Sequence, residues 1–357
     1  MMKKFITIFS AGILMGMGYS SRAQDIHFSQ FYENEIFHNP GLTGVFSGEY
    51  KYGVDYRSQW SSVATPFNTT MVAGETRVLV NREAGDYLSF GLAMTYDKAG
   101  TINFTSTQIY PAIAFNKAME DVHNTYLSLG FTGGYISRSV DQSLMTFSSQ
   151  YVNSQYLPTN PTMETPTYHN LHNYDVGAGI SLNSSLDLQS TLNYYLGIAV
   201  YHINSPTEIF SGGNVLVKLP MKVELNAGFH WPITENFSFT AHANYSNQHP
   251  YSEFVYGGMF TFKALRIEQP SIFAFHFGLL ARYQDAIIPC VKVDFQNVTV
   301  GFSYDVNNSS LGSMAGGASA TEITLYVKGN YNHRKNPRDP VMCPRFEDSP
   351  NIGNTWR

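Results

Sequence analysis

Apolar and polar residues alternate with a period of two in one segment of the chain after another. From Ser89 to Tyr96, large apolar side chains alternate with small or polar ones. Successive side chains of a strand point to opposite faces, so this pattern predicts strands with one apolar face. Four further segments have the same pattern, with these residues on the apolar face: Met221, Val223, Leu225, Ala227, Phe229 and Trp231; Phe237, Phe239, Ala241, Ala243 and Tyr245; Phe273, Phe275, Phe277 and Leu279; Val298, Val300, Phe302, Tyr304 and Val306.

The alternation predicts fourteen strands, an even number that leaves both ends of a closed barrel on one side of a membrane. The connections after even-numbered strands are short, whereas the long ones, at 140–169, 204–215 and 308–320, all follow odd-numbered strands. Bacterial barrels have short periplasmic turns and longer external loops, so this parity supports the strand count. The predicted strands are 48–60, 67–80, 87–98, 101–117, 124–139, 170–183, 191–203, 216–231, 236–247, 252–264, 271–283, 286–295, 297–307 and 321–330.

A soluble sandwich would also alternate, with its apolar face turned inward. Two observations favour a membrane barrel. The predicted strands are longer than the ~5–6 residues usual in soluble proteins. Aromatic residues lie near their ends, as in interfacial girdles. These aromatic residues are Trp60, Tyr96, Trp231, Tyr245, Tyr283 and Tyr304.

The first 23 residues have the pattern of a cleaved signal peptide. Lys3 and Lys4 precede an apolar run from Phe5 to Gly18, and Ser21 and Ala23 form a small-residue cleavage site. After Gly18 no apolar run approaches the ~20 residues of a spanning helix. We therefore expect an all-β, transmembrane outer-membrane β-barrel organised as signal peptide 1–23, periplasmic or luminal N-terminal segment 24–47, barrel 48–330 and periplasmic tail 331–357.

Composition narrows the classes of partner. The chain has 24 Tyr, 25 Phe and 3 Trp, which favours strands. Removing Lys3, Lys4 and Arg22 from 22 basic residues leaves 19 against 27 acidic residues, with no basic stripe, so we expect no nucleic-acid partner. Cys290 lies in a predicted strand and Cys343 in the tail. We expect two separate thiols, because a disulfide would require the tail to reach about mid-barrel.

Motifs for catalysis, nucleotide binding or metal binding do not occur, so we expect no enzyme, cofactor or metal site. His169 and His172 are three residues apart, which places them on opposite faces of a strand. Lys222 and Glu224 should both point into the lumen as an ion pair. The residues His230, His242 and His276 could meet Ser238 there as in a lipase, but polar lumen residues need no catalytic role.

Both ends of the mature chain resemble the PorP/SprF family of outer-membrane proteins, associated with the type IX secretion system of Bacteroidetes. The resemblance rests on FSQF and NPGLTG within 25–44, GVDYRSQW followed by Pro66 and Phe67, VGFSYDVNNSSL before ATEITLYV, and the tail motif Cys343, Pro344, Arg345 and Phe346. The eleven residues that follow Phe346 depart from the family pattern. The middle of the chain resembles the family only in architecture.

The resemblance implies a barrel that docks a secreted surface adhesin with a C-terminal sorting domain and helps to secrete or anchor it. It also implies a link to gliding motility or adhesion, and contacts with outer-membrane lipid and with periplasmic secretion components that bind peptidoglycan. An outer-membrane channel or transporter for small or lipidic solutes is the alternative, because a barrel of this size has room for one.

The segment from Asp25 to Gly44 is the least strand-like part of the mature chain and has the most specific resemblance. We predict a plug or partner-docking motif made of Phe28, Ser29, Gln30, Phe31, Asn39, Pro40, Gly41 and Leu42. Plugging is favoured because a row of exposed aromatic residues, which also includes Phe37, would be a liability on a free tail. The proline-containing loop 140–169 either folds over the barrel mouth or is an ordinary surface loop.

Overall fold

The computed structural model describes residues 25–61, 65–81, 83–119, 123–152, 155–161, 170–187, 192–208, 218–266, 269–308 and 318–331. The predicted signal peptide, His169 and the tail motif Cys343–Phe346 lie outside these residues. None of the helices in the described ranges is long and apolar enough to cross a bilayer.

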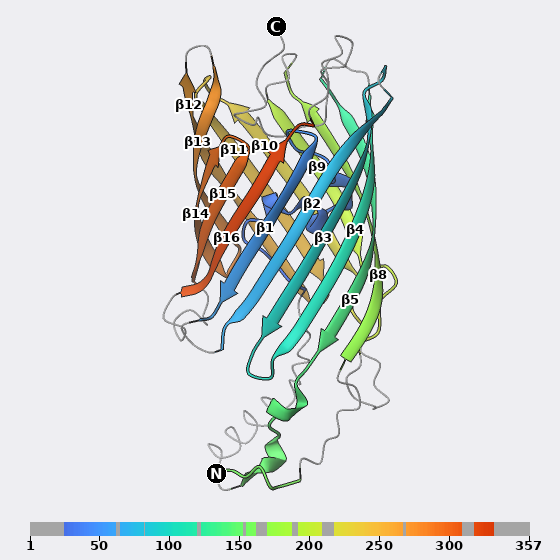
Figure 1. The fold of residues 1–357 in the computed structure, drawn as a ribbon, viewed down its shortest axis with the longest axis vertical. Helices are drawn as coiled ribbons and strands as arrows, with labels where there is room; N and C mark the ends of the chain where they lie inside the picture. Colours follow the sequence, from blue (N-terminus) through green and yellow to red (C-terminus); the bar gives the residue numbers. More distant parts are fainter. Residues whose placement is uncertain are drawn as a thin grey trace, which may run out of the picture.

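Fourteen antiparallel strands close into one barrel in sequence order, with β1 pairing with β16 (Figure 1). The predicted number of strands and the all-β barrel class are confirmed. The two remaining strands, β6 Tyr151–Val152 and β7 Gln155–Tyr156, pair in the loop after β5. The barrel strands are β1 Tyr50–Gln59, β2 Phe67–Asn81, β3 Asp86–Ala99, β4 Phe104–Ala118, β5 Tyr126–Ser139, β8 Asn170–Ser185, β9 Asn193–Tyr201, β10 Lys222–Pro232, β11 Phe237–Gln248, β12 Tyr251–Arg266, β13 Gln269–Arg282, β14 Ala286–Phe295, β15 Val298–Asn307 and β16 Ala318–Gly329.

The strand boundaries differ from the predicted ones by a few residues. The largest difference is at β10, which begins at Lys222 rather than at 216. Pro220 lies just before it and has no N–H to donate to a ladder. At β4 the strand begins at Phe104 rather than at 101, because the turn before it includes Asn103 with φ 49°.

The barrel is apolar outside and polar inside, as a membrane requires. On β3, Phe90 and Leu92 are 42% and 43% exposed, whereas Ser89 of the same strand faces the interior and is fully buried. On β13, Phe275 and Phe277 face outward and Ala274 and His276 face the interior. The period-two pattern is therefore inverted relative to a soluble sandwich.

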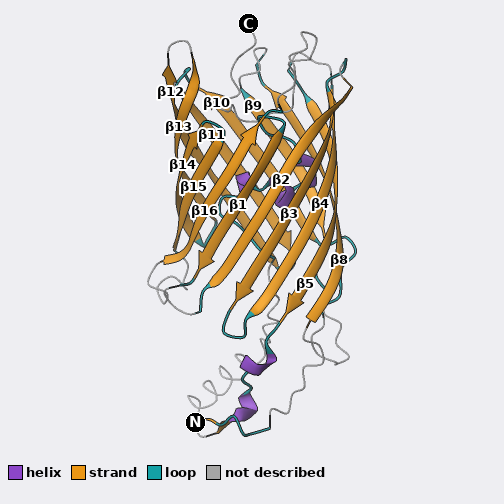
Figure 2. Cartoon of the chain, viewed as in Figure 1, coloured by secondary structure: helices purple, strands orange, loops and turns teal. Residues whose placement is uncertain are grey.

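Connection length defines the two rims. The turns between Asn81 and Asp86, Pro232 and Phe237, and Phe295 and Val298 lie on the rim that also holds the barrel ends Tyr50 and Gly329. This rim is periplasmic, because periplasmic turns are short. The long loop after β5 leaves from the opposite, external rim, and its 3-10 turns Gln142–Leu144 and Ser148–Gln150 project beyond it (Figure 2).

Residues 25–48, hereafter the luminal segment, lie inside the barrel, where Figure 2 shows their short helical turns. These turns are η1 Phe31–Glu33, α2 Glu35–His38 and η2 Pro40–Leu42. The segment starts beside His202 and Gln248, at the external ends of β9 and β11, and ends with Gly48 against Gly329. It therefore runs through the lumen from the external side to the periplasmic rim.

Candidate functional site

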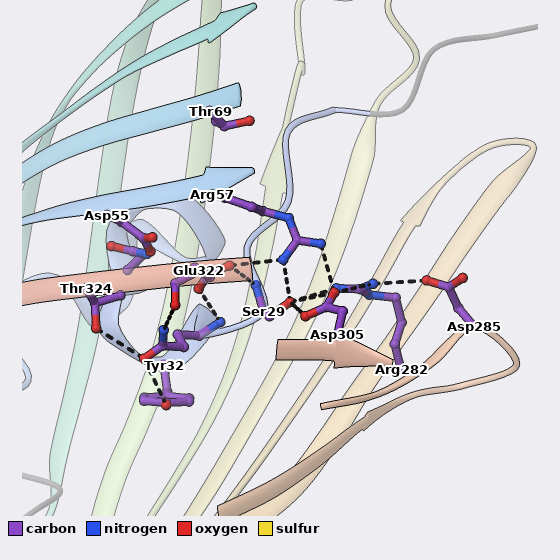
Figure 3. Close-up of polar contacts among 12 residues, drawn as sticks. Ser29, Tyr32, Asp55, Arg57, Thr69, Arg282, Asp285, Asp305, Glu322 and Thr324 are labelled. Carbon is purple, nitrogen blue, oxygen red and sulfur yellow. Dashed lines mark hydrogen bonds and ion pairs between the residues drawn. The ribbon is translucent and has the colours of Figure 1, made fainter. Parts of the chain in front are cut away.

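The first half of the luminal segment is held by the wall through Gln30 and through Ser29, which Figure 3 shows. The backbone N–H groups of both residues donate to the carboxylate of Glu322, each at 2.7 Å. The hydroxyl of Ser29 donates to Asp305 at 2.7 Å and accepts from Arg57 at 2.6 Å. These charge-assisted hydrogen bonds fix both the backbone and the side chain of the segment.

The charges around Ser29 form one buried network, which we call the Ser29 cluster. Arg57 pairs with Asp305 at 2.9 Å and with Glu322 at 3.1 Å. Arg282 pairs with Asp305 at 3.1 Å and donates to the hydroxyl of Ser29 at 3.0 Å. The side chains of Asp305 and Glu322 are fully buried, so each carboxylate depends on these partners for its charge.

Three of the resembling motifs meet the luminal segment in this cluster. Arg57 comes from GVDYRSQW, Asp305 from VGFSYDVNNSSL and Glu322 from ATEITLYV. Their strands β1, β15 and β16 are neighbours because the barrel closes between β1 and β16. The sequence analysis quoted these motifs without assigning a role to the three charged residues. Charges at lumen-facing positions near the closing seam were the available signal.

The second half of the luminal segment is held by close contacts with glycines of the wall, which we call the glycine seat. A Cβ atom on Gly130 of β5 would lie 2.1 Å from the carbonyl oxygen of Pro40. A Cβ on Gly179 of β8 would lie 2.0 Å from Oδ1 of Asn39, and one on Gly197 of β9 would lie 2.4 Å from its Nδ2. The wall is thus flat where the segment approaches most closely.

The NPGLTG motif is built for this seat. Asn39 Oδ1 accepts from the N–H of Gly41 at 2.8 Å, and Pro40 occupies the first position of η2, where a missing N–H costs little. Asn39 Nδ2 donates to Asn226 at 3.0 Å. Gly44 has φ +84°, a left-handed conformation that favours glycine, and its backbone N–H donates to Glu75 at 2.8 Å.

Aromatic residues fill the space between the two halves. Phe28 makes an edge contact with Phe37, which in turn contacts Tyr110 of β4. Tyr32 stacks on His242 of β11 with ring centroids 5.0 Å apart. The structure therefore brings the predicted motif residues together in the lumen. Phe28, Ser29, Gln30, Phe31, Asn39, Pro40, Gly41 and Leu42 are all buried.

The start of the segment is fixed by His202, which directly follows β9. Its ring lies 2.9 Å from a carboxylate oxygen of Asp175 and 3.3 Å from one of Asp25. Burial alone would lower the pKa of His202, but its hydrogen bonds to these carboxylates raise it to about 9. Burial alone would raise the pKa of Asp25, and His202 and Lys222 lower it well below its usual value. This contact is therefore an ion pair at neutral pH.

The serine and histidines considered for a lipase-like site do not come together in the part of the chain that is described. The hydroxyl of Ser238 has no hydrogen-bond partner among these residues, so no Ser–His dyad is formed. His230 contacts Thr240 and His276 contacts Thr261 and Asp294. Among the described ranges, no group of three or more His, Cys, Asp or Glu residues could hold a metal ion.

The other candidate residues occupy ordinary positions. Lys222 and Glu224 point into the lumen and pair at 2.6 Å, as the spacing predicted. His172 stacks on Tyr135 and shares a hydrogen bond with its hydroxyl at 2.8 Å. Cys290 is a free cysteine buried with Tyr32. Its predicted separation from Cys343 is untested, because Cys343 lies outside the described residues.

Two cavities lie on either side of the luminal segment. The periplasmic one is lined by Leu42, Val45 and Phe46 of the segment and by Lys292 and Lys328 of the wall. The external one is lined by Asp25, Ile26, His27 and His38 together with residues of β10–β12. The segment thus divides the lumen and presents a different surface to each side.

These features define a bacterial outer-membrane β-barrel with a segment of its own chain in the lumen. The chain belongs to the family of type IX secretion system membrane proteins PorP/SprF, whose model matches residues 20–326. Family and fold are those of secretion and membrane barrels, and they place the protein in the outer membrane.

Solved structures of other barrels are similar to this chain at low identity. The toluene transporter TbuX of Ralstonia pickettii has a TM-score of 0.49 at 10% identity, over 87% of this chain and 95% of that chain. The monoaromatic hydrocarbon channel CymD has a TM-score of 0.47 at 11% identity, over 90% and 98%. The toluene transporter TodX of Pseudomonas putida has a TM-score of 0.49 at 8% identity, over 85% and 93%. No curated protein matches the chain.

Proposed function

We propose that this barrel docks a secreted, surface-exposed adhesin of the type IX secretion system and helps to secrete it or anchor it at the outer membrane. The observation that carries the proposal is the filled lumen of a member of this family. The Ser29 cluster and the glycine seat fix the luminal segment at many points. A barrel filled in this way offers partners its two rims.

The external loop after β5 supports a protein partner. Tyr151, Val152 and Tyr156 are 55%, 43% and 41% exposed, and they belong to the strands β6 and β7 of this external loop. Asp141 is the one charged residue among residues 140–161. Exposed apolar side chains on an aqueous surface are typical of protein-interaction sites.

On the periplasmic side, we propose contacts with secretion components, including those that bind peptidoglycan. This rim carries the barrel ends, and Tyr331, the last described residue, contacts Thr76 and Glu49 there. The tail motif Cys343–Phe346 is proposed as part of this contact.

The test is deletion of the gene, followed by measurement of surface adhesins through protease shaving and mass spectrometry. We expect loss of at least one protein with a C-terminal sorting domain from the surface. Re-expression of the intact chain should restore it. Re-expression of a chain with 144–160 replaced by a Gly–Ser linker should give a folded barrel without restoration.

Normal surface display of every such protein after deletion would overturn the proposal. The alternative, a channel for small or lipidic solutes, predicts instead that the purified barrel alone conducts in planar bilayers or mediates uptake. If the function is docking rather than transport, we expect the purified barrel to conduct only after the luminal segment has been displaced.

A further inference from the structure

The external cavity is a polar site formed jointly by the luminal segment and the wall. Asp25, His27 and His38 contribute from the segment. The wall residues are Lys222, Glu224, Asn244, Ser246, Gln248, Tyr251, Ser252 and Glu253. Tyr251 and Ser252 are exposed at the external end of β12, so the cavity opens toward the cell surface.

Carboxylates outnumber cations in and around this cavity. Asp25, Glu224 and Glu253 line it, against one lysine, Lys222, which lies 2.6 Å from Glu224 and 3.9 Å from Asp25. Arg282 pairs with Glu253 at 3.2 Å, but the same guanidinium also pairs with two other carboxylates.

The two other carboxylates that pair with Arg282 are those of Asp285, at 2.9 Å, and Asp305, at 3.1 Å. His202 shares its charge between Asp25 and Asp175. Burial lowers the pKa of His27 to about 4, so His27 adds no positive charge at neutral pH. Arg57 also pairs with Asp305 and with Glu322, but the carboxylates still outnumber the cations, so the outer lumen has an excess of negative charge that attracts cations.

Two imidazoles in the cavity wall also have an unused nitrogen. Nε2 of His38 and Nε2 of His27 are buried and have no hydrogen-bond partner among the described residues. The side chain of His38 is 91% buried, and its Nδ1 lies 2.9 Å from a carboxylate oxygen of Glu224. In the neutral ring this carboxylate holds the proton on Nδ1, which leaves Nε2 as a hydrogen-bond acceptor. An unused buried acceptor calls for a donor from a ligand.

We propose that this cavity binds a lysine or arginine side chain of an extracellular protein. The ammonium or guanidinium would lie among the carboxylates of Glu253 and Asp25 and donate to Nε2 of His38. The identity of the protein as a secreted adhesin rests on the proposed function. The cationic site itself follows from the charges and the unused acceptors of this cavity.

The site also links the partner to the luminal segment. Asp25, His27 and His38 belong to the segment, whereas Lys222 and Glu253 belong to the wall. A cation that contacts both parts stabilises the segment in its seated position, because a ligand that binds one state of a protein favours that state.

The test uses the purified full-length barrel in a non-ionic detergent and three fluorescent peptides: pentalysine, pentaglutamine and pentaglutamate. Fluorescence anisotropy at about 0.15 M salt measures the dissociation constants, since this salt screens distant charges. We expect pentalysine to bind at least about tenfold more tightly than pentaglutamine. Pentaglutamate should bind most weakly.

Two variants probe the site. Glu253→Gln removes one lining carboxylate and should weaken pentalysine binding at least about fivefold. Ser246→Lys places an ammonium in the cavity and should abolish the preference for pentalysine. The matched control is Asp141→Asn, which removes an exposed carboxylate beyond the same rim and should leave binding unchanged. Heat-dependent migration on gels verifies that each barrel is folded.

Equal binding of the three peptides would overturn the cationic site. So would an equal loss in Asp141→Asn and Glu253→Gln, because binding would then reflect diffuse surface charge. These outcomes are separate from the deletion test above. If deletion abolishes surface display but pentalysine shows no preference, docking stands and the cationic site falls.

Discussion

The two halves of the luminal segment are held by different kinds of interaction. At the Ser29 cluster, buried charges from β1, β13, β15 and β16 are satisfied by each other and by the segment. At the glycine seat, uncharged backbone and side-chain atoms of Asn39, Pro40 and Gly41 pack directly on glycines of β5, β8 and β9. Charge fixes the first half, and shape fixes the second.

The difference shows what each half would tolerate. A buried ion pair is strongly destabilised when one partner is removed, because the remaining charge has lost its solvation. A close backbone contact is destabilised by any added atom. Removal of a charged group should therefore detach the first half of the segment, and addition of a methyl group should detach the second half.

Cys290 is a native reporter for both halves. It is buried in a cluster with Tyr32 of the luminal segment. When the segment leaves, Cys290 should face the lumen and react with a charged maleimide that does not cross membranes. A Cys343→Ser background makes the labelling specific.

The largest effect is expected from Arg57→Ala. Asp305 and Glu322 would each lose an ion-pair partner at about 3 Å while buried, which costs about 3–5 kcal/mol. Maleimide labelling of Cys290 should then rise steeply in an intact barrel. Lys117→Ala is the matched control: Lys117 is 45% exposed and pairs with Asp86, so its loss should cost less than about 1 kcal/mol. Similar labelling of Cys290 in both variants would show that the Ser29 cluster does not hold the luminal segment in place.

The architecture could be predicted from the sequence because it depends on local signals. Alternation with a period of two set the strands, and the parity of loop lengths set the two rims. The position of the segment between Asp25 and Gly48 depends instead on contacts with the strands, such as those that Ser29 makes with residues 28 and 293 positions away along the chain. Its aromatic residues favoured a plug, but they did not indicate which residues of the wall the segment contacts.

The two modes of attachment were also not equally visible. Gly130, Gly179 and Gly197 look like any small residue on a lumen-facing strand, and only the structure shows Asn39 and Pro40 above them. Arg57, Asp305 and Glu322 were visible as charges within the resembling motifs. Their convergence required knowledge of the barrel closure between β1 and β16.

The second prediction tests the glycine seat with a pair of glycines on one strand. Gly130→Ala would place a Cβ 2.1 Å from the carbonyl oxygen of Pro40, and such overpacking costs about 1–3 kcal/mol. Gly133→Ala is the control, because a Cβ there meets no atom within 4 Å. We expect faster labelling of Cys290 in Gly130→Ala and no change in Gly133→Ala. Equal rates would show that the seat accommodates an added methyl group.

The smallest effect is expected from pH, because it acts only on the start of the segment. The pKa of His202 is raised from 6.5 to about 9, so its contribution is complete below pH 6.5 and is lost as pH rises through 9. The pKa of His27 is lowered to about 4, so its contribution is complete above pH 6.5 and is lost as pH falls toward 4.

The start of the segment should therefore be most stable near pH 6.5. Hydrogen exchange of the amides from Asp25 to His27, corrected for the intrinsic pH dependence of exchange, should be slowest there. The His202 contribution is at most about 3 kcal/mol, and the Ser29 cluster should hold the rest of the segment at pH 10. In His202→Asn, the change between pH 6.5 and 10 should disappear while the change below pH 6.5 remains. If hydrogen exchange still becomes faster between pH 6.5 and 10 in that variant, a group other than His202 controls the alkaline release of the start of the segment.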